Sequence, residues 1–357
     1  MRAYFKNVDF LRFLLCIGII LRHIHNYILY KPEFSHISIY DNIIENMFGF
    51  IPVDCFFIIS GFFLFFTTDF SKNVYSFMKK KLIRLLPAAV FITALCSLTW
   101  SVFNHKIIIN MNNFWALFML QNVGITNEYT SSENIWFISV LFWVSCLLFY
   151  LYKIMDKKWF NLLMVCICFF GYSFYYNFGI DKEPVETYYI FNYGIMRGLA
   201  GMSFGYIIYQ LYEDLFKQIK DKQETLSTKL IYTYAEGCLL FFVFMNILYK
   251  NIDYENPLLI VLTFAVLFIL FILKKGYISK ILDNNFSKFL GKYTYSIFVT
   301  HFLVVHVWIF YIYKYCPNLV LFYPEYNIPA VFITSIIAGI ITYHCVEKPV
   351  AEFLTKQ

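Results

Sequence analysis

The stretch DFLRFLLCIGIILRHIHNYILY, residues 9–30, decides how the rest of this chain is interpreted. It is apolar and long enough to cross a bilayer, yet it carries Arg12, Arg22, His23 and His25. Ionisable side chains are costly in hydrocarbon, so they are expected to face the interior of a helix bundle. This cluster therefore predicts a functional site inside such a bundle.

Helical geometry selects one face of this segment. Arg12 and His23 are eleven residues apart, close to three whole turns, so they project from one face about 16 Å apart. Asp9 lies one turn before Arg12, where a carboxylate pairs with and orients a guanidinium. Arg22 and His25 point elsewhere. The alternative is that Arg12 snorkels to the interface and His23 only hydrogen-bonds a neighbouring helix.

The composition is that of a membrane protein. Apolar residues make up 60% of the chain, charged residues 15%, and the mean hydropathy is +0.61. Soluble proteins carry about a quarter charged residues. The nine cysteines follow no metal or disulfide spacing and are interpreted as small buried apolar residues. No small-residue cleavage site follows the first apolar run, which predicts an uncleaved first membrane helix.

Windows of about 20 apolar residues predict ten membrane spans. Alternate connections hold twenty-one Lys and Arg residues on one side and five on the other. The positive-inside rule then places both termini in the cytoplasm, so the net charge of +6 reflects topology and predicts no nucleic-acid partner. We predict an all-α polytopic membrane helix bundle with both termini cytoplasmic, forming one domain over residues 1–357. The predicted spans cover approximately residues 9–30, 43–66, 85–103, 134–152, 160–178, 188–211, 230–249, 257–273, 293–313 and 328–346.

The second span, VDCFFIISGFFLFF at residues 53–66, places the carboxylate of Asp54 near its outer end. Ser60 and Gly61 allow neighbouring helices to approach closely. No base stands beside Ser60 in the sequence to activate it, so it is interpreted as a packing residue and not as a nucleophile.

The connection after it, FMKKKLIRLLP at residues 77–87, is strongly basic. Lys81 and Arg84 are one helical turn apart, an arrangement suited to the phosphates of an anionic cofactor. The alternative is that they are ordinary basic residues of a cytoplasmic connection. The long outer connection, about residues 104–133, contains NNFWALFMLQN, which either lies on the membrane surface or folds back into the bundle.

Later spans add further polar residues. Trp136 lies at an outer boundary, where tryptophan commonly anchors a helix at the interface. Arg197 is alone among glycines and apolar residues, which predicts that it faces a polar cavity or a carboxylate. His301 lies mid-span and is the natural second imidazole for the site that contains His23. Glu347 lies at the cytoplasmic edge of the last span.

The order of these pieces resembles one known family. The series DFLRFLL with His23, FFIISGFFL, KKKLIRLLP, IWFISVLFW, the helix with Arg197, YSIFVTH and VEKP is similar to the acyltransferase 3 family of bacterial integral-membrane O-acyltransferases. The likeness covers residues 5 to about 350. It implies a ten-helix enzyme that moves an acyl group, commonly acetyl, from cytoplasmic acyl-CoA to a hydroxyl of a surface polysaccharide, lipopolysaccharide or lipid-linked glycan precursor.

The resemblance also assigns residues. Two features depart from the family pattern. Lys81 stands where an arginine is usual, and a lysine cannot make a planar bidentate contact with a phosphate. The sequence also shows no carboxy-terminal esterase-like domain of the kind that some members carry. The positions that match family motifs are Arg12 and His23 in the first span, Ser60 and Gly61 in the second, Lys81 and Arg84 before the proline, His301, and Glu347.

Acyl transfer to an alcohol needs a base for the hydroxyl proton and a donor for the developing oxyanion. We expect His23 to act as general base or as acyl carrier, and Arg12 to hold a phosphate of acyl-CoA near the inner entrance. Lys81 and Arg84 are expected to bind the remaining phosphates. Arg197 and His301 are expected to line the cavity and to stabilise the oxyanion or position the acceptor, and we expect no metal.

Two other classes of protein fit part of this pattern. Intramembrane Arg and His residues in a ten-helix bundle also suit a transporter of a small solute or a lipid-linked glycan. Against a transporter, the two halves of the chain show no paired repeat. A non-catalytic membrane scaffold is the third interpretation.

Overall fold

The computed structural model describes residues 4–24, 51–107, 110–121, 123–125, 128–178, 182–220, 225–248, 257–316 and 324–355. Most of this part of the chain is helical and it contains only one short β-hairpin, so the predicted all-α class is confirmed. His25, residues 25–30 of the first predicted span and residues 43–50 of the second lie outside the described residues.

A helix occupies each of the ten predicted spans. The long helices are α1 (Lys6–Ile24), α3 (Ile51–Thr67), α4 (Val74–Phe103), α6 (Trp136–Ile154), α7 (Lys157–Phe178), α8 (Tyr193–Leu211), α10 (Leu226–Leu248), α12 (Pro257–Leu273), α14 (Asn285–Val307) and α17 (Pro324–Thr342). The shorter pieces are α5 (Asn112–Ala116), the 3-10 turn η3 (Glu133–Ile135), α9 (Lys217–Lys220), α13 (Tyr277–Ile281), α15 (Tyr313–Tyr315), α18 (Lys348–Thr355) and the π-helical turns η4 (Tyr212–Phe216), η5 (Trp308–Ile312) and η6 (Tyr343–Glu347).

Among the described residues, six helical segments are long and apolar enough to cross a membrane, as in a multi-pass membrane protein. The helices α3 and α12 are apolar but shorter. The ten crossings and the cytoplasmic termini remain predictions. The six segments are Val74–Phe103, Glu133–Ile154, Lys157–Phe178, Leu226–Asn246, Asn285–Ile312 and Ile328–Thr355.

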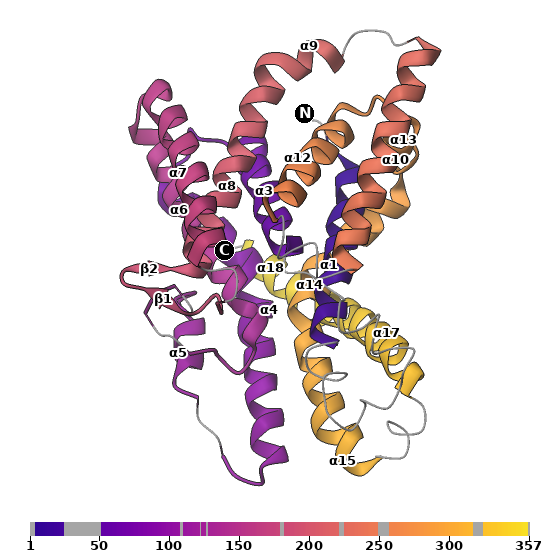
Figure 1. The fold of residues 1–357 in the computed structure, drawn as a ribbon. Coiled ribbons are helices and arrows are strands. Elements are labelled where there is room, and N and C mark those ends of the chain that lie inside the picture. The colour runs from indigo at the N-terminus through magenta and orange to yellow at the C-terminus, as the bar shows by residue number, and fades with distance from the viewer. Residues whose placement is uncertain are drawn as a thin grey trace.

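The connections gather at two ends of the molecule, with α9 and α13 at one end and α5 and α15 at the other (Figure 1). We call the first the basic face. There Lys153 Nζ donates to the carbonyl oxygen of Lys72 at 2.6 Å, and Lys274 Nζ lies 2.5 Å from Asp283 Oδ2. At the second, which we call the opposite face, Tyr129 Oη donates to Glu183 Oε2 at 2.6 Å. The predicted topology makes the basic face cytoplasmic.

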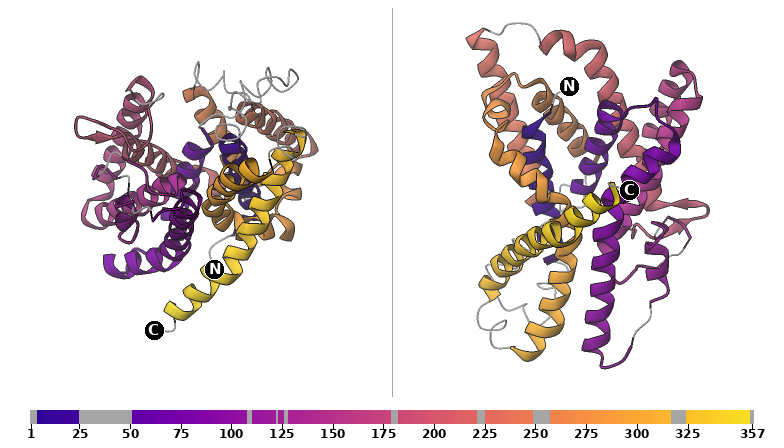
Figure 2. Two further views of the ribbon diagram at one scale, coloured as in Figure 1. Left: turned by 90° about the horizontal axis from the view of Figure 1, so that it is seen from below. Right: turned by 180° about the vertical axis from the view of Figure 1, so that it is seen from behind.

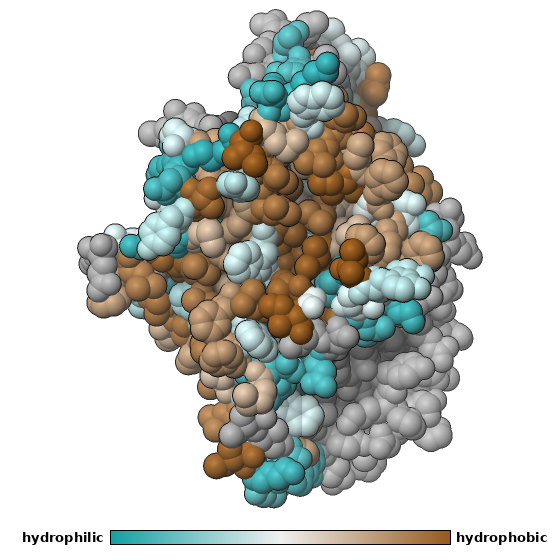
Figure 3. All heavy atoms as spheres, turned by 90° about the vertical axis from the view of Figure 1, so that its left-hand side faces the viewer, coloured by the Kyte–Doolittle hydropathy of each residue, from teal (hydrophilic) through white to brown (hydrophobic). Residues whose placement is uncertain are grey.

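The surface between these ends is apolar on the side formed by α6 and α7. Figure 3 shows it as a broad hydrophobic area with hydrophilic groups above and below. Leu162, Phe169 and Phe170 of α7 and Leu147 of α6 are among its exposed side chains. An apolar area of this extent is typical of a surface that faces lipid.

Helix α14 lies at the centre of the described bundle. It packs against α1, α4 and α17, and α1 in turn contacts α3, which packs closely on α8. Figure 2 shows the α17–η6–α18 rod crossing the bundle and extending beyond it at the C-terminus. A Cβ on Gly205 of α8 would lie 2.2 Å from the carbonyl oxygen of Ile58, so only glycine lets α3 and α8 approach this closely.

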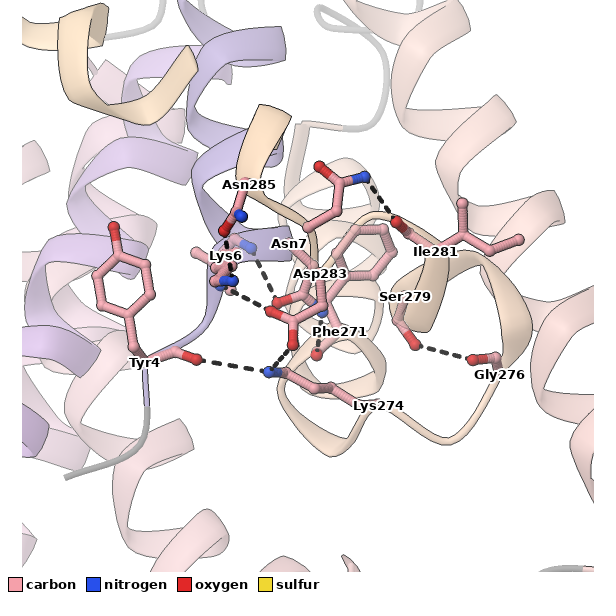
Figure 4. A network of polar contacts seen from close by, with 12 residues as sticks. Tyr4, Lys6, Asn7, Phe271, Lys274, Gly276, Ser279, Ile281, Asp283 and Asn285 are labelled. Carbon is pink, nitrogen blue, oxygen red and sulfur yellow. Dashed lines mark hydrogen bonds and ion pairs between the residues drawn. The ribbon is translucent and has the colours of Figure 1, made fainter. Parts of the chain in front are cut away.

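Contacts with the α12–α14 region fix the start of α1 (Figure 4). The backbone N–H of Lys6 donates to Asp283 Oδ1 at 2.9 Å, which caps an otherwise unpaired group at the helix terminus. Asn7 Nδ2 donates to the carbonyl oxygen of Phe271 at 2.6 Å. These bonds set where the site residues further along α1 meet α14.

One predicted boundary was wrong. Residues 188–192 were predicted to begin a span, but they belong to the antiparallel hairpin of β1 (Thr187–Tyr188) and β2 (Phe191–Asn192). The helix begins after Asn192, whose side chain caps it by accepting from the backbone N–H of Ile195 at 3.0 Å. In α4 the helix begins eleven residues before the predicted span, because Asn73 caps it ahead of the basic turn.

The segment NNFWALFMLQN folds back onto the bundle. Trp143 Nε1 of α6 donates to the carbonyl oxygen of Met119 at 2.7 Å, and Met119 is fully buried. The other side of the segment exposes about half of Phe114, Leu117 and Phe118. The segment therefore packs on α6 with one side and presents apolar rings outward with the other.

Candidate active site

Two imidazoles meet where α1 crosses α14. The ring centroids of His23 and His301 lie 5.1 Å apart, with 44° between the ring planes. The ring of Phe302 stands almost perpendicular to that of His23 at 5.5 Å. The two histidines singled out in the sequence therefore belong to one site, which is walled by aromatic side chains.

The hydrogen bonds of His301 fix its tautomer. Its Nδ1 lies 2.6 Å from the carbonyl oxygen of Phe298, and a carbonyl only accepts, so Nδ1 carries the proton. The other nitrogen, Nε2, is then left with a lone pair. It is buried and no group in the described part of the chain hydrogen-bonds to it. His301 thus offers one basic nitrogen to whatever occupies the site.

Asn134 supports this arrangement and was not assigned a role from the sequence. Its Nδ2 donates to the carbonyl oxygens of Phe298 at 2.6 Å and Val299 at 3.3 Å, and its Oδ1 accepts from Ser132 Oγ at 2.8 Å. The amide therefore ties η3 to the turn of α14 that carries His301. An asparagine at the start of an apolar span was the only signal for it in the sequence.

The pair predicted from helical spacing, Asp9 and Arg12, lies on the basic-face side of the two imidazoles. Arg12 Nη1 and Asp9 Oδ1 are 3.3 Å apart, and the Arg12 guanidinium stacks over the ring of Phe63 at 4.6 Å. Tyr4 Oη donates to Asp9 Oδ2 at 2.5 Å. Burial and the neighbouring Asp9 carboxylate raise the pKa of Tyr4 to about 12. A Cβ on Gly291 of α14 would lie 2.4 Å from Asp9 Cβ, so α14 holds this carboxylate in place.

The basic turn of α4 joins the same region. Lys81 is half-buried and donates from Nζ to Ser145 Oγ at 2.8 Å. Arg84 is exposed and lies within electrostatic range of Asp9, Arg12 and Glu347. We call Arg12, Lys81 and Arg84 the cation cluster. Three cations near one another form an arrangement that can hold phosphate groups.

Glu347 lies beside this cluster. It sits in the π-helical turn η6, where Ser296 Oγ of α14 donates to its Oε2. Tyr295 donates to the carbonyl oxygen of Leu85 at 2.5 Å, which ties α14 to α4 next to the cluster. Glu347 therefore links the end of the last span to α14 beside the cation cluster.

Arg197 has a different setting from the imidazoles. Its Nε lies 2.7 Å from Asp54 Oδ1 and its Nη2 lies 2.8 Å from Asp54 Oδ2, a bidentate pair that joins α8 to α3. The rings of Tyr175 and Trp136 lie 5.0 and 6.0 Å from the guanidinium. Of the two predicted surroundings, the carboxylate is the one present. Asp54 accepts from two of the five guanidinium donors, and the expected contact of Arg197 with an oxyanion stays a prediction.

Trp136 and Ser60 contribute to packing. Trp136 is 8% exposed, so it is not the interfacial anchor that its position suggested, and ring contacts through Phe137 and Phe298 lead from it to His301. Gly61, next to Ser60, faces α8: a Cβ there would lie 2.2 Å from the carbonyl oxygen of Met202. The interpretation of this serine–glycine pair as a helix contact fits the structure.

Comparison with known proteins gives one match. A family model described as an acyltransferase domain matches residues 5–344, nearly the whole chain. No curated protein and no solved structure matches it.

Proposed function

The chain belongs to the acyltransferase 3 family, and on that basis we propose that it moves an acyl group, commonly acetyl, from acyl-CoA to a hydroxyl of a surface polysaccharide, lipopolysaccharide or lipid-linked glycan precursor. The product is an ester, and the enzyme works in the bacterial cytoplasmic membrane. The observation that carries this proposal is the pair of imidazoles of His23 and His301, with the lone pair of His301 Nε2 inside the bundle.

The proposed reaction forms a C–O bond and breaks a C–S bond. His23 takes the proton of the acceptor hydroxyl while the hydroxyl oxygen attacks the thioester carbonyl, and CoA leaves as the thiolate. The imidazole then returns the proton to the thiolate sulfur. In the covalent variant, a nitrogen of His23 attacks the thioester first, and the acceptor oxygen then takes the acyl group from His23.

His301 is suited to orient His23. Since Nδ1 of His301 is committed to the carbonyl oxygen of Phe298, its Nε2 is available to accept an N–H from the neighbouring imidazole. An imidazole that donates from one nitrogen presents a lone pair on the other, which is how a histidine is held in its basic tautomer. Asn134 donates to the same carbonyl oxygen of Phe298 and keeps it in place.

The cation cluster is the proposed site for the phosphates of acyl-CoA. Arg84 is exposed, and the Lys81 ammonium uses one of its three donors on Ser145, which leaves two. Arg12 meets Asp9 through Nη1. The donor then enters from the basic face, and its thioester extends along α1 toward His23, which is about 16 Å beyond Arg12.

Mass spectrometry of surface polysaccharide tests the proposal. We would compare cells that carry the intact gene, a deletion, His23→Ala and His105→Asn, with matched amounts of protein in the membrane. His105 is an exposed histidine with φ of 53°, a conformation that asparagine tolerates, so it is the matched control. An acyl-sized mass increment is expected in the intact and His105→Asn strains alone.

Two results would contradict the proposal. An increment that survives His23→Ala excludes this residue as base and as acyl carrier. Glycan whose mass is the same with and without the gene excludes acyl transfer to it and favours the transporter.

A further inference from the structure

The last polar side chain of α14 before the turn η5 is His306. It is 3% exposed, and its Nδ1 is buried with no hydrogen-bond partner among the residues that the structure describes. Leaving a buried polar atom unpaired costs about 1–3 kcal/mol. Such an atom is therefore expected where a ligand completes its hydrogen bonding.

Several aromatic rings lie around the His306 imidazole. The rings of Phe302 and Phe310 lie 4.3 and 5.4 Å from that of His306, and Trp100 of α4 stands perpendicular to it at 5.7 Å. Trp100 and Phe310 are 4.5 Å apart, and Phe103 follows at 4.6 Å from Phe310. We call Trp100, Phe310 and Phe103 the aromatic ladder.

The ladder leads from His306 to the opposite face. It follows the last turns of α4 and the start of η5, and Lys314 of α15 covers the ring of Phe103 at 4.7 Å. The ends of α4 and α15 lie together at the foot of the molecule in Figure 1. This side is remote from the cation cluster, where the donor is proposed to bind.

His306 lies next to the imidazole pair in this direction. It is five residues beyond His301, about 7.5 Å further along α14 toward the opposite face. It is also close enough to His23 to interact with it electrostatically. The order through the bundle is the cation cluster, the pair of His23 and His301, His306, and the aromatic ladder.

Building on the proposed function, we propose that His306 positions the acceptor, a sugar that reaches the imidazole pair from the opposite face along the aromatic ladder. One face of a pyranose presents C–H groups, which pack on the electron-rich faces of aromatic rings. A sugar hydroxyl hydrogen-bonds His306 Nδ1, and a neighbouring hydroxyl then reaches His23. His306 thereby selects which hydroxyl is acylated.

The test uses purified full-length protein, acyl-CoA with a labelled acyl group, and surface polysaccharide extracted from the deletion strain as acceptor. Initial rates give a KM for each substrate. The variants are His306→Phe, which removes the polar atoms, His306→Asn, which places an amide atom at the Nδ1 position, and His306→Gln, which reaches only the Nε2 position. His105→Asn is the control.

Loss of one hydrogen bond raises the acceptor KM about tenfold in His306→Phe and His306→Gln, with the acyl-CoA KM unchanged within about twofold. His306→Asn and His105→Asn are expected to stay within about threefold of the wild type. Trp100→Leu, which removes a ring of the ladder, is expected to raise the acceptor KM about threefold or more.

An unchanged acceptor KM in His306→Gln, or an equal rise for both substrates, overturns the assignment of His306 while wild-type transfer still supports the enzyme. Wild-type protein that transfers no label overturns the proposed function and this assignment together. A folded His306→Asn protein with normal acyl-CoA KM makes the comparison with His306→Gln valid even if His306→Phe does not fold.

Discussion

The Arg197–Asp54 pair allows a sharp test of what holds α3 and α8 together. The two residues are 3% and 0% exposed, and both carboxylate oxygens accept from the guanidinium at 2.7 and 2.8 Å. Asp54→Leu leaves the guanidinium inside the protein without its carboxylate, and Arg197→Met leaves the carboxylate without its guanidinium. Breaking a buried pair in this way costs about 3–5 kcal/mol.

The double variant gives the opposite expectation. Leucine and methionine fill similar volumes and leave no buried charge, so the free energy of unfolding should return to within about 2 kcal/mol of the wild type. The sum of the two single losses then exceeds the loss in the double variant by at least about 4 kcal/mol. We would measure this coupling energy by unfolding all four proteins with SDS in one detergent and following helicity by circular dichroism.

Additive losses, with a coupling below about 0.5 kcal/mol, would refute the reasoning. The same proteins decide whether Arg197 takes part in chemistry. A structural role predicts that the folded double variant transfers acyl groups within about tenfold of the wild-type rate, because its site on α1 and α14 is intact. A stable double variant that loses more than about a hundredfold would show that Arg197 acts on the reacting groups, as the sequence first suggested.

Three other changes test the site and its supports. His301→Asn keeps a donor at the Nδ1 position and removes Nε2, so the rate of acyl transfer should fall about 10²–10⁴-fold; an unchanged rate in the labelled acyl-CoA assay would exclude a role for this nitrogen. Gly205→Ala places a methyl group 2.2 Å from backbone, and the overpacking should cost about 1–3 kcal/mol or more. Gly237→Ala is the control, because its added carbon meets only the end of a side chain at 3.5 Å. If Gly205→Ala and Gly237→Ala lost the same free energy of unfolding in SDS, the close packing of α3 on α8 would be contradicted. Burial and Asp9 raise the pKa of Tyr4 to about 12, so the contribution of Tyr4 to stability is complete below about pH 10 and is lost as the pH rises toward 12. The pKa can be measured by NMR on ¹³C-labelled tyrosine, with Tyr4→Phe to identify the signal. A measured pKa near 10 would exclude the hydrogen bond from Tyr4 to Asp9.

The sequence predicted relations within one helix better than relations between helices. The pairing of Asp9 with Arg12 follows from the period of a single helix, and the structure shows it at 3.3 Å. Arg197 was predicted to meet a cavity or a carboxylate, but its partner Asp54 is 143 residues away along the chain. Helical periodicity says nothing about which of several buried carboxylates an arginine reaches.

Contacts with backbone atoms could not be predicted at all. The tautomer of His301 depends on the carbonyl oxygen of Phe298, and Asn134 reaches that oxygen only because η3 packs on α14. Hydropathy likewise did not predict the β-hairpin that includes residues 188–192. Tyr189 and Ile190 are each 85% exposed at its turn, yet they score like the start of a membrane helix. The capping asparagine before α8 was the one local signal that marked the true helix start.

Helix α14 carries three polar residues with different proposed roles, and it fixes their positions relative to one another. Ser296, His301 and His306 are spaced by five residues, and each step of five turns the helix by about 140°, so the three side chains leave on three different faces. Ser296 meets Glu347, His301 meets His23, and His306 meets Trp100. One rigid element therefore sets the donor side, the reacting imidazoles and the acceptor side of the proposed enzyme.

Glycine contacts on both sides of α14 hold this register. A Cβ on Gly291 of α14 would lie 2.4 Å from Asp9 Cβ, and one on Gly339 of α17 would lie 2.5 Å from Ile297 Cα. Neither contact leaves room for α14 to rotate without moving α1 or α17. Close packing at such contacts leaves little space between α14 and its neighbours α1 and α17. Asp9 and His23 of α1 therefore both pack against α14, at Gly291 and at His301.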